Sequence, residues 1–161
     1  MIGQGGILVD VGVAALLGGA IGLDREIGGK TAGLRTHMIV AAASALFVNC
    51  AALMIGKFAA YSDGAQVSID PTRVIQAIVT GISFLGAGTI VMHRKAGIVK
   101  GLTTAASILL VSAIGMTVAT GAYLLAFAVT GGALLVLAGI GSIEKRFRKR
   151  RGPTQDDDKT E

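Results

Sequence analysis

Long apolar runs separated by short polar segments dominate the chain. Five of these runs are about 18 to 20 residues long, enough for a helix to cross a hydrocarbon core roughly 30 Å thick. A soluble helical bundle would carry charges at helical spacing on each exposed face, and these runs carry almost none. The pattern predicts an all-α, polytopic membrane protein with about five transmembrane helices, at Gly6–Leu23, His37–Gly56, Val74–Met92, Gly101–Ala119 and Ala122–Ile140.

Composition agrees with this pattern and narrows the partners. Of the 161 residues, 52% are hydrophobic and 16% are charged, and the mean hydropathy is +0.69. The formal net charge of +5 would suggest nucleic acid if it formed a patch on a soluble fold. Most of the excess instead follows the last apolar run, so orientation in a lipid bilayer explains it better, and no nucleic-acid partner is predicted.

The positions of lysine and arginine predict how the chain is oriented. Thirteen of the fifteen lie in the segments after the first, third and fifth runs, and Lys57 and Arg73 lie after the second. Since basic residues concentrate on the cytoplasmic side, we expect the N-terminus outside and the C-terminus in the cytoplasm. Residues 1–144 are then the membrane domain. Residues 145–161 are a basic, then acidic, cytoplasmic tail that we expect to be disordered.

Polar residues inside the runs are the candidates for function, because lipid exposure of such groups is costly. Asp10 shares a helix face with the small residues of the first run. Arg73, Gln76, Thr80 and Ser83 form a stripe at helical spacing, and Asp70-Pro71 before it is a typical helix start. We expect Asn49, Thr103, Thr104 and Ser107 to face this stripe. Two interpretations remain open, a hydrated cavity or ordinary hydrogen bonding between helices.

The segment from Gly22 to Thr36 is unusually rich in charge and glycine. We interpret it as a cytoplasmic loop in which Asp24, Arg25 and Glu26 connect helix ends with Arg35 and Thr36; a simple positive-inside anchor is the alternative. Asp10, Asp24 and Glu26 are the candidate ligands for a metal, with Mg²⁺ as the candidate ion, although an arginine in the same cavity would repel it. No other cofactor is predicted.

Small residues at helical spacing predict close helix packing, since backbones can approach there. The sets are Ala14, Gly18 and Gly22 in the first run and Ala77 and Gly81 in the third, with Gly86 and Gly88 following. The two histidines lie at run ends far apart in sequence, and we find no motif of a hydrolase, metalloprotease or nucleotide-binding enzyme. The chain is therefore not expected to be an enzyme.

Four separated motifs resemble the MgtC/SapB family of bacterial inner-membrane proteins over roughly residues 10–120. They are Ile21–Glu26, Ala32–Thr36, Arg73 and Gln76 with Gly81–Gly88, and Val99–Ala106 followed by Ile114-Gly115. The resemblance places Lys100, Thr103 and Thr104 in the functional network with the polar residues already named. Asp24 stands where the family more often has glutamate, and Leu109 stands near a common tryptophan.

The resemblance implies a role in magnesium homeostasis and in growth at low magnesium. The family includes a protein that restrains the F-type ATP synthase and carries a soluble C-terminal domain, which this chain is expected to lack. Two hypotheses follow: a regulator that binds other membrane proteins, and a transporter or channel for Mg²⁺ or another small ion or solute. The small-residue faces also predict a homodimer.

Overall fold

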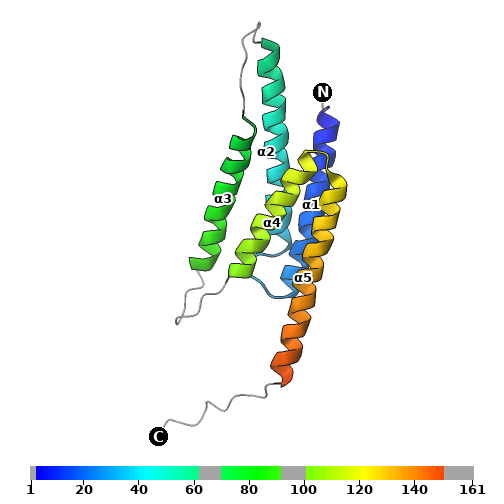
Figure 1. Ribbon diagram of the computed structural model, residues 1–161, viewed down its shortest axis with the longest axis vertical. Helices are drawn as coiled ribbons and strands as arrows, with labels where there is room; N and C mark the ends of the chain where they lie inside the picture. The colour runs from blue at the N-terminus through cyan, green and yellow to red at the C-terminus, as the bar shows by residue number, and fades with distance from the viewer. Residues whose placement is uncertain (1–2, 62–69, 92–100, 151–161) are drawn as a thin grey trace.

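The computed structural model describes the backbone of residues 3–61, 70–91 and 101–150, with side chains to residue 58, at 70–90 and at 101–137. Five helices run alternately up and down (Figure 1): α1 (Gln4–Ile27), α2 (Leu34–Tyr61), α3 (Thr72–Val91), α4 (Leu102–Ala119) and α5 (Tyr123–Arg150). The described ranges contain no strand. The predicted all-α fold is confirmed.

The alternation gives the bundle two distinct ends (Figure 1). At the N-terminal end lie the start of α1, the α2 C-terminus, the start of α3 and the hairpin between α4 and α5. At the opposite end, here called the basic end, lie the connection between α1 and α2 and the start of α4. The basic residues at this end whose side chains are described are Arg25, Lys30 and Arg35.

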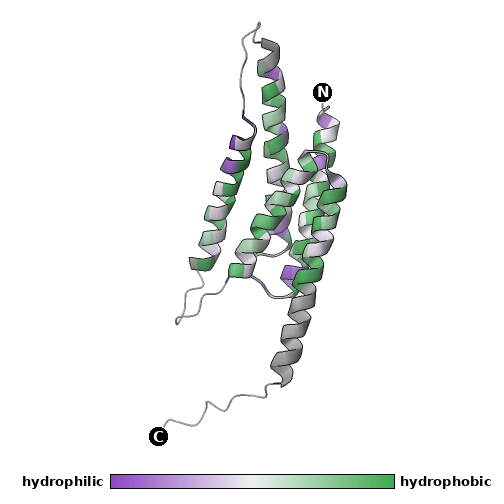
Figure 2. Cartoon of the chain, viewed as in Figure 1, coloured by the Kyte–Doolittle hydropathy of each residue, from purple (hydrophilic) through white to green (hydrophobic). Residues whose placement is uncertain are grey.

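Four of the helices, α1 to α4, are long and apolar enough to cross a membrane. Figure 2 shows hydrophobic residues along most of their length. The apolar part of α5 whose side chains are described, Tyr123–Leu137, is shorter. The last residues of the fifth predicted span, 138–140, are helical, but their side chains lie outside the described residues.

Helices α1, α2 and α4 form the core, and α5 packs on α1 and α4. Most of the buried core side chains are small or β-branched, among them Ala14, Ala41, Val111 and Val118. Helix α3 lies outside this group and contacts mainly α4. Of its apolar window 11% is buried, against 50% for α4. Helix α3 is therefore a peripheral element.

Glycines set the closest helix contacts. A Cβ at Gly18 would lie 2.5 Å from the His37 carbonyl oxygen, and one at Gly22 would lie 2.8 Å from Leu34 Cα. A Cβ at Gly115 would overlap the carbonyl oxygen of Ala41, so α4 and α2 touch backbone to backbone. This confirms the predicted packing face of the first run, and Gly115 adds a contact on α4.

The glycines predicted to pack in α3 behave differently from one another. Gly86 is buried, with a Cβ position 3.4 Å from Ala105 of α4. Gly81 and Gly88 are exposed, and no atom lies within 4 Å of a Cβ built on either. Their predicted packing role within the chain is wrong, because the face of α3 that carries them points away from α4.

Two predicted boundaries also need correction. Asp24, Arg25 and Glu26 belong to the last turn of α1, and Arg35 and Thr36 to the first turn of α2. A basic residue in the last turn complements the helix dipole, so Arg25 extends α1 instead of ending it. Helix α5 continues to Arg150, because lysine and arginine are good helix formers. Residues 145–150 are thus helical, and 151–161 lie outside the described residues.

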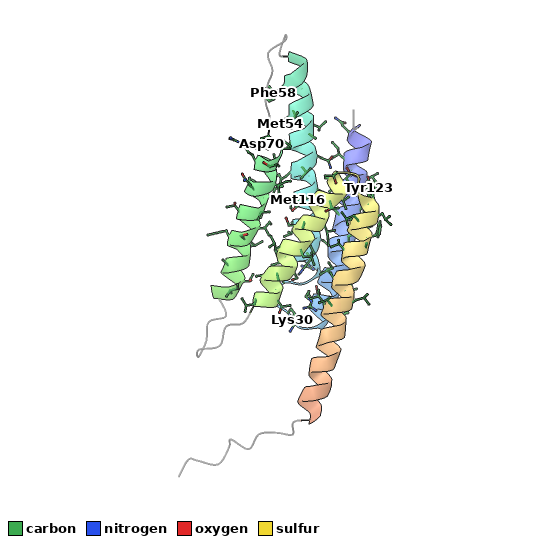
Figure 3. The ribbon with its side chains drawn as sticks, in the orientation of Figure 1. Lys30, Met54, Phe58, Asp70, Met116 and Tyr123 are labelled. Carbon is green, nitrogen blue, oxygen red and sulfur yellow. The ribbon has the colours of Figure 1, made fainter. Side chains whose placement is uncertain are left out.

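The start of α3 follows the sequence signal. The backbone and hydroxyl groups of Thr72 both donate to Asp70 Oδ1, at 2.9 and 2.6 Å. These two hydrogen bonds, the hydroxyl one above all, hold the pKa of the exposed Asp70 carboxyl below its usual value. Figure 3 labels Asp70, just before the start of α3, and Tyr123, at the start of α5, both at the N-terminal end of the bundle. The predicted cap is confirmed.

Candidate functional site

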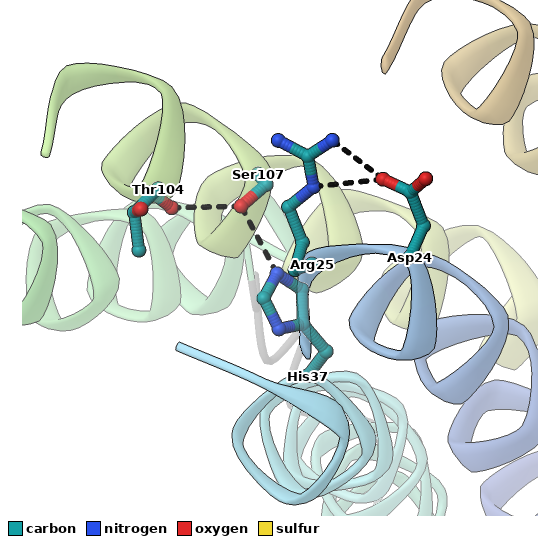
Figure 4. Close-up of polar contacts among 5 residues, drawn as sticks. All are labelled: Asp24, Arg25, His37, Thr104 and Ser107. Carbon is teal, nitrogen blue, oxygen red and sulfur yellow. Dashed lines mark hydrogen bonds and ion pairs between the residues drawn. The ribbon is translucent and has the colours of Figure 1, made fainter. Parts of the chain in front are cut away.

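Arg25 is the buried charge at the basic end. Its side chain is 6% exposed and donates from Nε and Nη2 to Asp24 Oδ2, at 3.0 and 2.5 Å (Figure 4). Adjacent residues on a helix do not face each other, so the long arginine side chain must fold back to reach its neighbour. Because a buried cation is costly unless it is paired, Asp24 stabilises the buried state of Arg25.

His37 connects the start of α2 to α4 beside this ion pair. The ring is fully buried, with Nδ1 2.8 Å from the Gly33 carbonyl oxygen and Nε2 3.0 Å from Ser107 Oγ. A carbonyl only accepts, so Nδ1 carries a hydrogen and donates to Gly33. Gly18 and Gly22 of α1 pack closely against the backbone and Cβ of His37. The three helices of the core therefore meet at His37.

Ser107 has two acceptors for one proton. Its hydroxyl lies 2.9 Å from the Thr104 carbonyl oxygen as well as next to Nε2 of His37 (Figure 4). When His37 is neutral, Nε2 needs the Ser107 proton, and the hydroxyl turns away from Thr104. When His37 is charged, Nε2 donates and Ser107 is free to donate to Thr104. The orientation of Ser107 thus reports the charge of His37.

Glu26 has a structural partner. Its Oε2 accepts the backbone N–H of Leu34 at 2.8 Å, which caps the first turn of α2 from the end of α1. With Asp24 on Arg25 and Glu26 on Leu34, both carboxylates expected to bind metal at this end already have partners. Within the described ranges, no group of three or more His, Cys, Asp or Glu side chains could hold a metal ion.

A second polar contact lies midway along the core. Ser44 of α2 and Ser112 of α4 are buried with their hydroxyl oxygens 2.8 Å apart, and Ser44 also donates to the Val40 carbonyl. The close contact of Gly115 with Ala41 lies at the same helix interface. The serine pair is therefore enclosed by packed backbone.

The third polar contact is at the N-terminal end. Asn49 Nδ2 donates to Asp10 Oδ2 at 3.1 Å and to the Ala45 carbonyl at 3.2 Å. The Tyr123 hydroxyl donates to Asp10 Oδ1 at 2.5 Å. Asp10 is 5% and Asn49 1% exposed, whereas Tyr123 is 39% exposed. This cluster joins α1, α2 and α5.

The predicted stripe on α3 does not face these contacts. Arg73, Gln76, Thr80 and Ser83 are all exposed, and Thr80 donates to the Gln76 carbonyl of its own helix. Asn49 instead binds Asp10, and Ser107 binds His37. The expectation that Asn49 and Ser107 face the stripe is therefore wrong within a single chain.

The remaining predicted site residues are dispersed. Arg35 and Thr103 are exposed, Thr36 is partly buried and Thr104 is buried. Lys100 lies outside the described residues. The sequence thus predicted several members of the polar contacts but not one common network.

Sequence reasoning missed four members of the buried contacts. Tyr123 hydrogen-bonds to the buried carboxylate of Asp10, although it begins a helix far along the chain from Asp10. Ser44 and Ser112 resemble the ordinary small residues of a membrane span. His37 lies four residues after Gly33, the spacing at which a side chain can reach back to a carbonyl, and that signal was available in the sequence.

Together, the apolar helices and the polar contacts buried between them define a small polytopic membrane protein. Residues 11–146 match the MgtC family. The chain belongs to this family, as its motifs predicted. No solved structure matches it.

Curated relatives differ in name and length. The chain is 43% identical over 113 residues to "Putative magnesium transporter YhiD" of Escherichia coli (strain K12), covering 69% of this chain and 49% of that protein. It is 36% identical over 140 residues to Protein SrpB of Synechococcus elongatus, covering 83% and 74%. It is 39% identical over 108 residues to Protein MgtC of Brucella abortus, covering 67% and 40%. The chain thus spans about half the length of YhiD.

Proposed function

We propose that this chain is a bacterial inner-membrane protein that takes part in magnesium homeostasis by binding other membrane proteins through helix α3. Membership of the MgtC family and the magnesium in the name of YhiD support the physiological part. The observation that carries the molecular part is the outward-facing polar stripe of α3. The F-type ATP synthase is the partner that the family resemblance suggests, and a second copy of the chain is the simplest one.

The two faces of α3 are opposite in character. Successive residues turn by roughly 100°, so positions 73, 76, 80 and 83 fall on one side of the helix. Ile78, Ile82 and Gly86 fall on the other side, where Gly86 meets Ala105 of α4. One face of α3 is therefore used within the chain, and the polar face is left for something else.

Helix stability does not account for this polar face. Arg73 lies in the first turn of α3, where the helix dipole disfavours a positive charge. Gln76 and Ser83 would lie against lipid tails, which offer no hydrogen bonds. A partner helix would supply such bonds at about 0.6 kcal/mol each.

Photo-crosslinking from α3 tests the proposal. A photoreactive residue at Gln76 or Ser83 is expected to give crosslinked products in native membranes. The matched control is Leu124 of α5, which is 86% exposed and apolar, and it should give none. Crosslinked products that contain only a second copy of the chain would show that α3 serves self-association and does not bind other membrane proteins. Equal crosslinking from all three positions, or none, would contradict it.

A growth assay connects the same surface to magnesium. Arg73→Ala and Gln76→Leu should reduce growth at low magnesium toward that of a deletion strain, because both remove polar contacts from the α3 face. Lys57→Ala is the control, since it removes an exposed positive charge from α2. Normal growth of the α3 variants at normal protein levels would show that the polar face of α3 is not needed for growth at low magnesium.

We further propose that the basic end faces the cytoplasm. Lysine and arginine favour that side, and Arg25, Lys30 and Arg35 all lie there. In a Cys50→Ala background, a cysteine at Asp70 should react with a membrane-impermeant maleimide in intact cells, and one at Lys30 only after the cells are opened. The reverse labelling pattern would show that the basic end faces outside and that the proposed orientation is wrong.

Transport of Mg²⁺ or another small ion or solute is the second candidate function. The buried carboxylate of Asp10 and the polar contacts along the core favour it. We rank transport lower than partner binding because the close backbone contact between Gly115 and Ala41 leaves little space between the polar contacts. Mg²⁺ flux into liposomes that depends on the protein would reverse this ranking.

A further inference from the structure

The cluster at the N-terminal end of the core holds a carboxylate without a counter-charge. Asp10 is 5% exposed, and its two hydrogen bonds come from the neutral groups of Asn49 and Tyr123. Among the described residues, no basic side chain lies within ion-pairing distance of it; Asp24 at the other end of α1 is paired in this way. Buried charges are normally paired or bound to a metal, so Asp10 requires a positive partner.

Asn49 provides a second and independent indication. Its Oδ1 is buried and is the one described side-chain atom of this kind without a hydrogen-bond partner. Nδ2 is fixed by its two acceptors, Asp10 Oδ2 and the Ala45 carbonyl. Because Oδ1 and Nδ2 share one carbon, Oδ1 lies a few ångströms from the Asp10 carboxylate. A buried acceptor next to a buried anion is unfavourable unless a positive group binds both.

A proton would solve only half of this problem. It would neutralise Asp10 but leave Asn49 Oδ1 unpaired, unless the amide turned over and gave up its bond to Ala45. A metal cation could accept oxygen ligands from Asp10, Asn49 and Tyr123 together. Carboxylate and amide carbonyl oxygens are ligands that suit hard cations such as Mg²⁺, and the Tyr123 oxygen adjoins them.

The site lies near one end of the bundle. Asp10 lies about 9 Å along α1 from Gln4, near the end of the helix. Tyr123 begins α5 at the same end and is 39% exposed. We propose that Asp10, Asn49 and Tyr123 bind one small, hard cation that enters from the N-terminal end of the bundle. This site uses α1, α2 and α5 and does not depend on partner binding by α3.

Thermal unfolding of the full chain in mild detergent tests the proposal. MgCl2 and NaCl are compared with choline chloride at equal ionic strength. The Mg²⁺ concentration is raised to about 10 mM, which exceeds the roughly 10⁻⁴–10⁻³ M dissociation constants of weak extracellular Ca²⁺ sites. Near 100 times the Kd, the bound cation should raise Tm by about 5 °C. A rise with only one of the two salts identifies the cation. No rise with either overturns the site.

Variants assign the effect to the cluster. Asp10→Asn and Asn49→Leu should abolish the rise in Tm, and Tyr123→Phe should reduce it. Asp70→Asn is the matched control, since it makes the same change at an exposed carboxylate of the same end. If Asp10→Asn keeps the full rise, the cation binds elsewhere and the proposal is wrong.

Chemical labelling keeps the test valid if the variants do not fold. A hydrophobic carbodiimide should modify Asp10 of the unaltered protein in choline chloride, as located by peptide mass spectrometry. The cation that raises Tm should slow this modification roughly tenfold or more, because it occupies the carboxylate. Equal rates with and without the cation, or no modification of Asp10 in choline, would overturn the proposal.

Discussion

Replacing Gly115 by alanine is expected to destabilise the bundle by more than about 3 kcal/mol, a large part of the 5–15 kcal/mol that typically separates folded from unfolded chains. The added methyl group would overlap the carbonyl oxygen of Ala41 and crowd its carbonyl carbon and Cα. Those atoms belong to the backbone of α2, so no side-chain rotation relieves the overlap. The measurement is the free energy of unfolding in a titration with denaturing detergent.

Gly12→Ala is the control for this prediction. Gly12 is an exposed helical glycine, and no atom lies within 4 Å of a Cβ built on it. The same change there should leave the free energy of unfolding unchanged or slightly higher, since alanine favours helix. Gly115→Ala with a stability like that of Gly12→Ala would mean that α2 and α4 are farther apart than described.

Replacing His37 by alanine is expected to cost about 3 kcal/mol of stability. The change empties a fully buried site and removes the contact from α2 to Ser107 of α4. The buried Arg25 would also lose a neighbour that closes its surroundings. The same detergent titration measures this loss, and Ser83→Ala on the exposed face of α3 should stay within about 0.5 kcal/mol of the unaltered protein.

A double-mutant cycle separates the hydrogen bond from the lost packing. His37→Ala, Ser107→Ala and the double variant should give a coupling energy of about 0.6 kcal/mol, the average for such bonds between membrane helices. The rest of the His37→Ala loss then belongs to the cavity. A coupling energy of zero would show that His37 and Ser107 are neighbours without a hydrogen bond that contributes to stability.

Apolar run length was sufficient to predict the helices, because a membrane span needs little information beyond hydrophobicity. Helix ends were harder to predict. Charges usually mark the end of a span, yet Arg25 is buried and continues α1 for another turn. Its neighbour Asp24 makes that burial acceptable, and such a local pairing cannot be read from charge pattern alone.

The direction of a helix face was the main limit at the candidate site. Periodicity placed Arg73, Gln76 and Ser83 on one side of α3, and that grouping is correct. It could not tell whether the side points to the bundle or away from it, since lipid-facing and protein-facing residues both follow a helical period. Asp10 and Asn49 were correctly selected as polar residues within spans. Their contact with Tyr123 depends on how α5 packs, which the sequence pattern does not specify.

The backbone contact between Gly115 and Ala41 limits how the molecule can move. Shear motions require packed helices to slide past one another by small steps. Sliding α4 along α2 would bring a side chain from the neighbouring turn into a gap that fits only a hydrogen atom. The contact therefore opposes sliding of α4 along α2. A larger displacement is left to the helices outside this pair, among them α3, which is held mainly by α4.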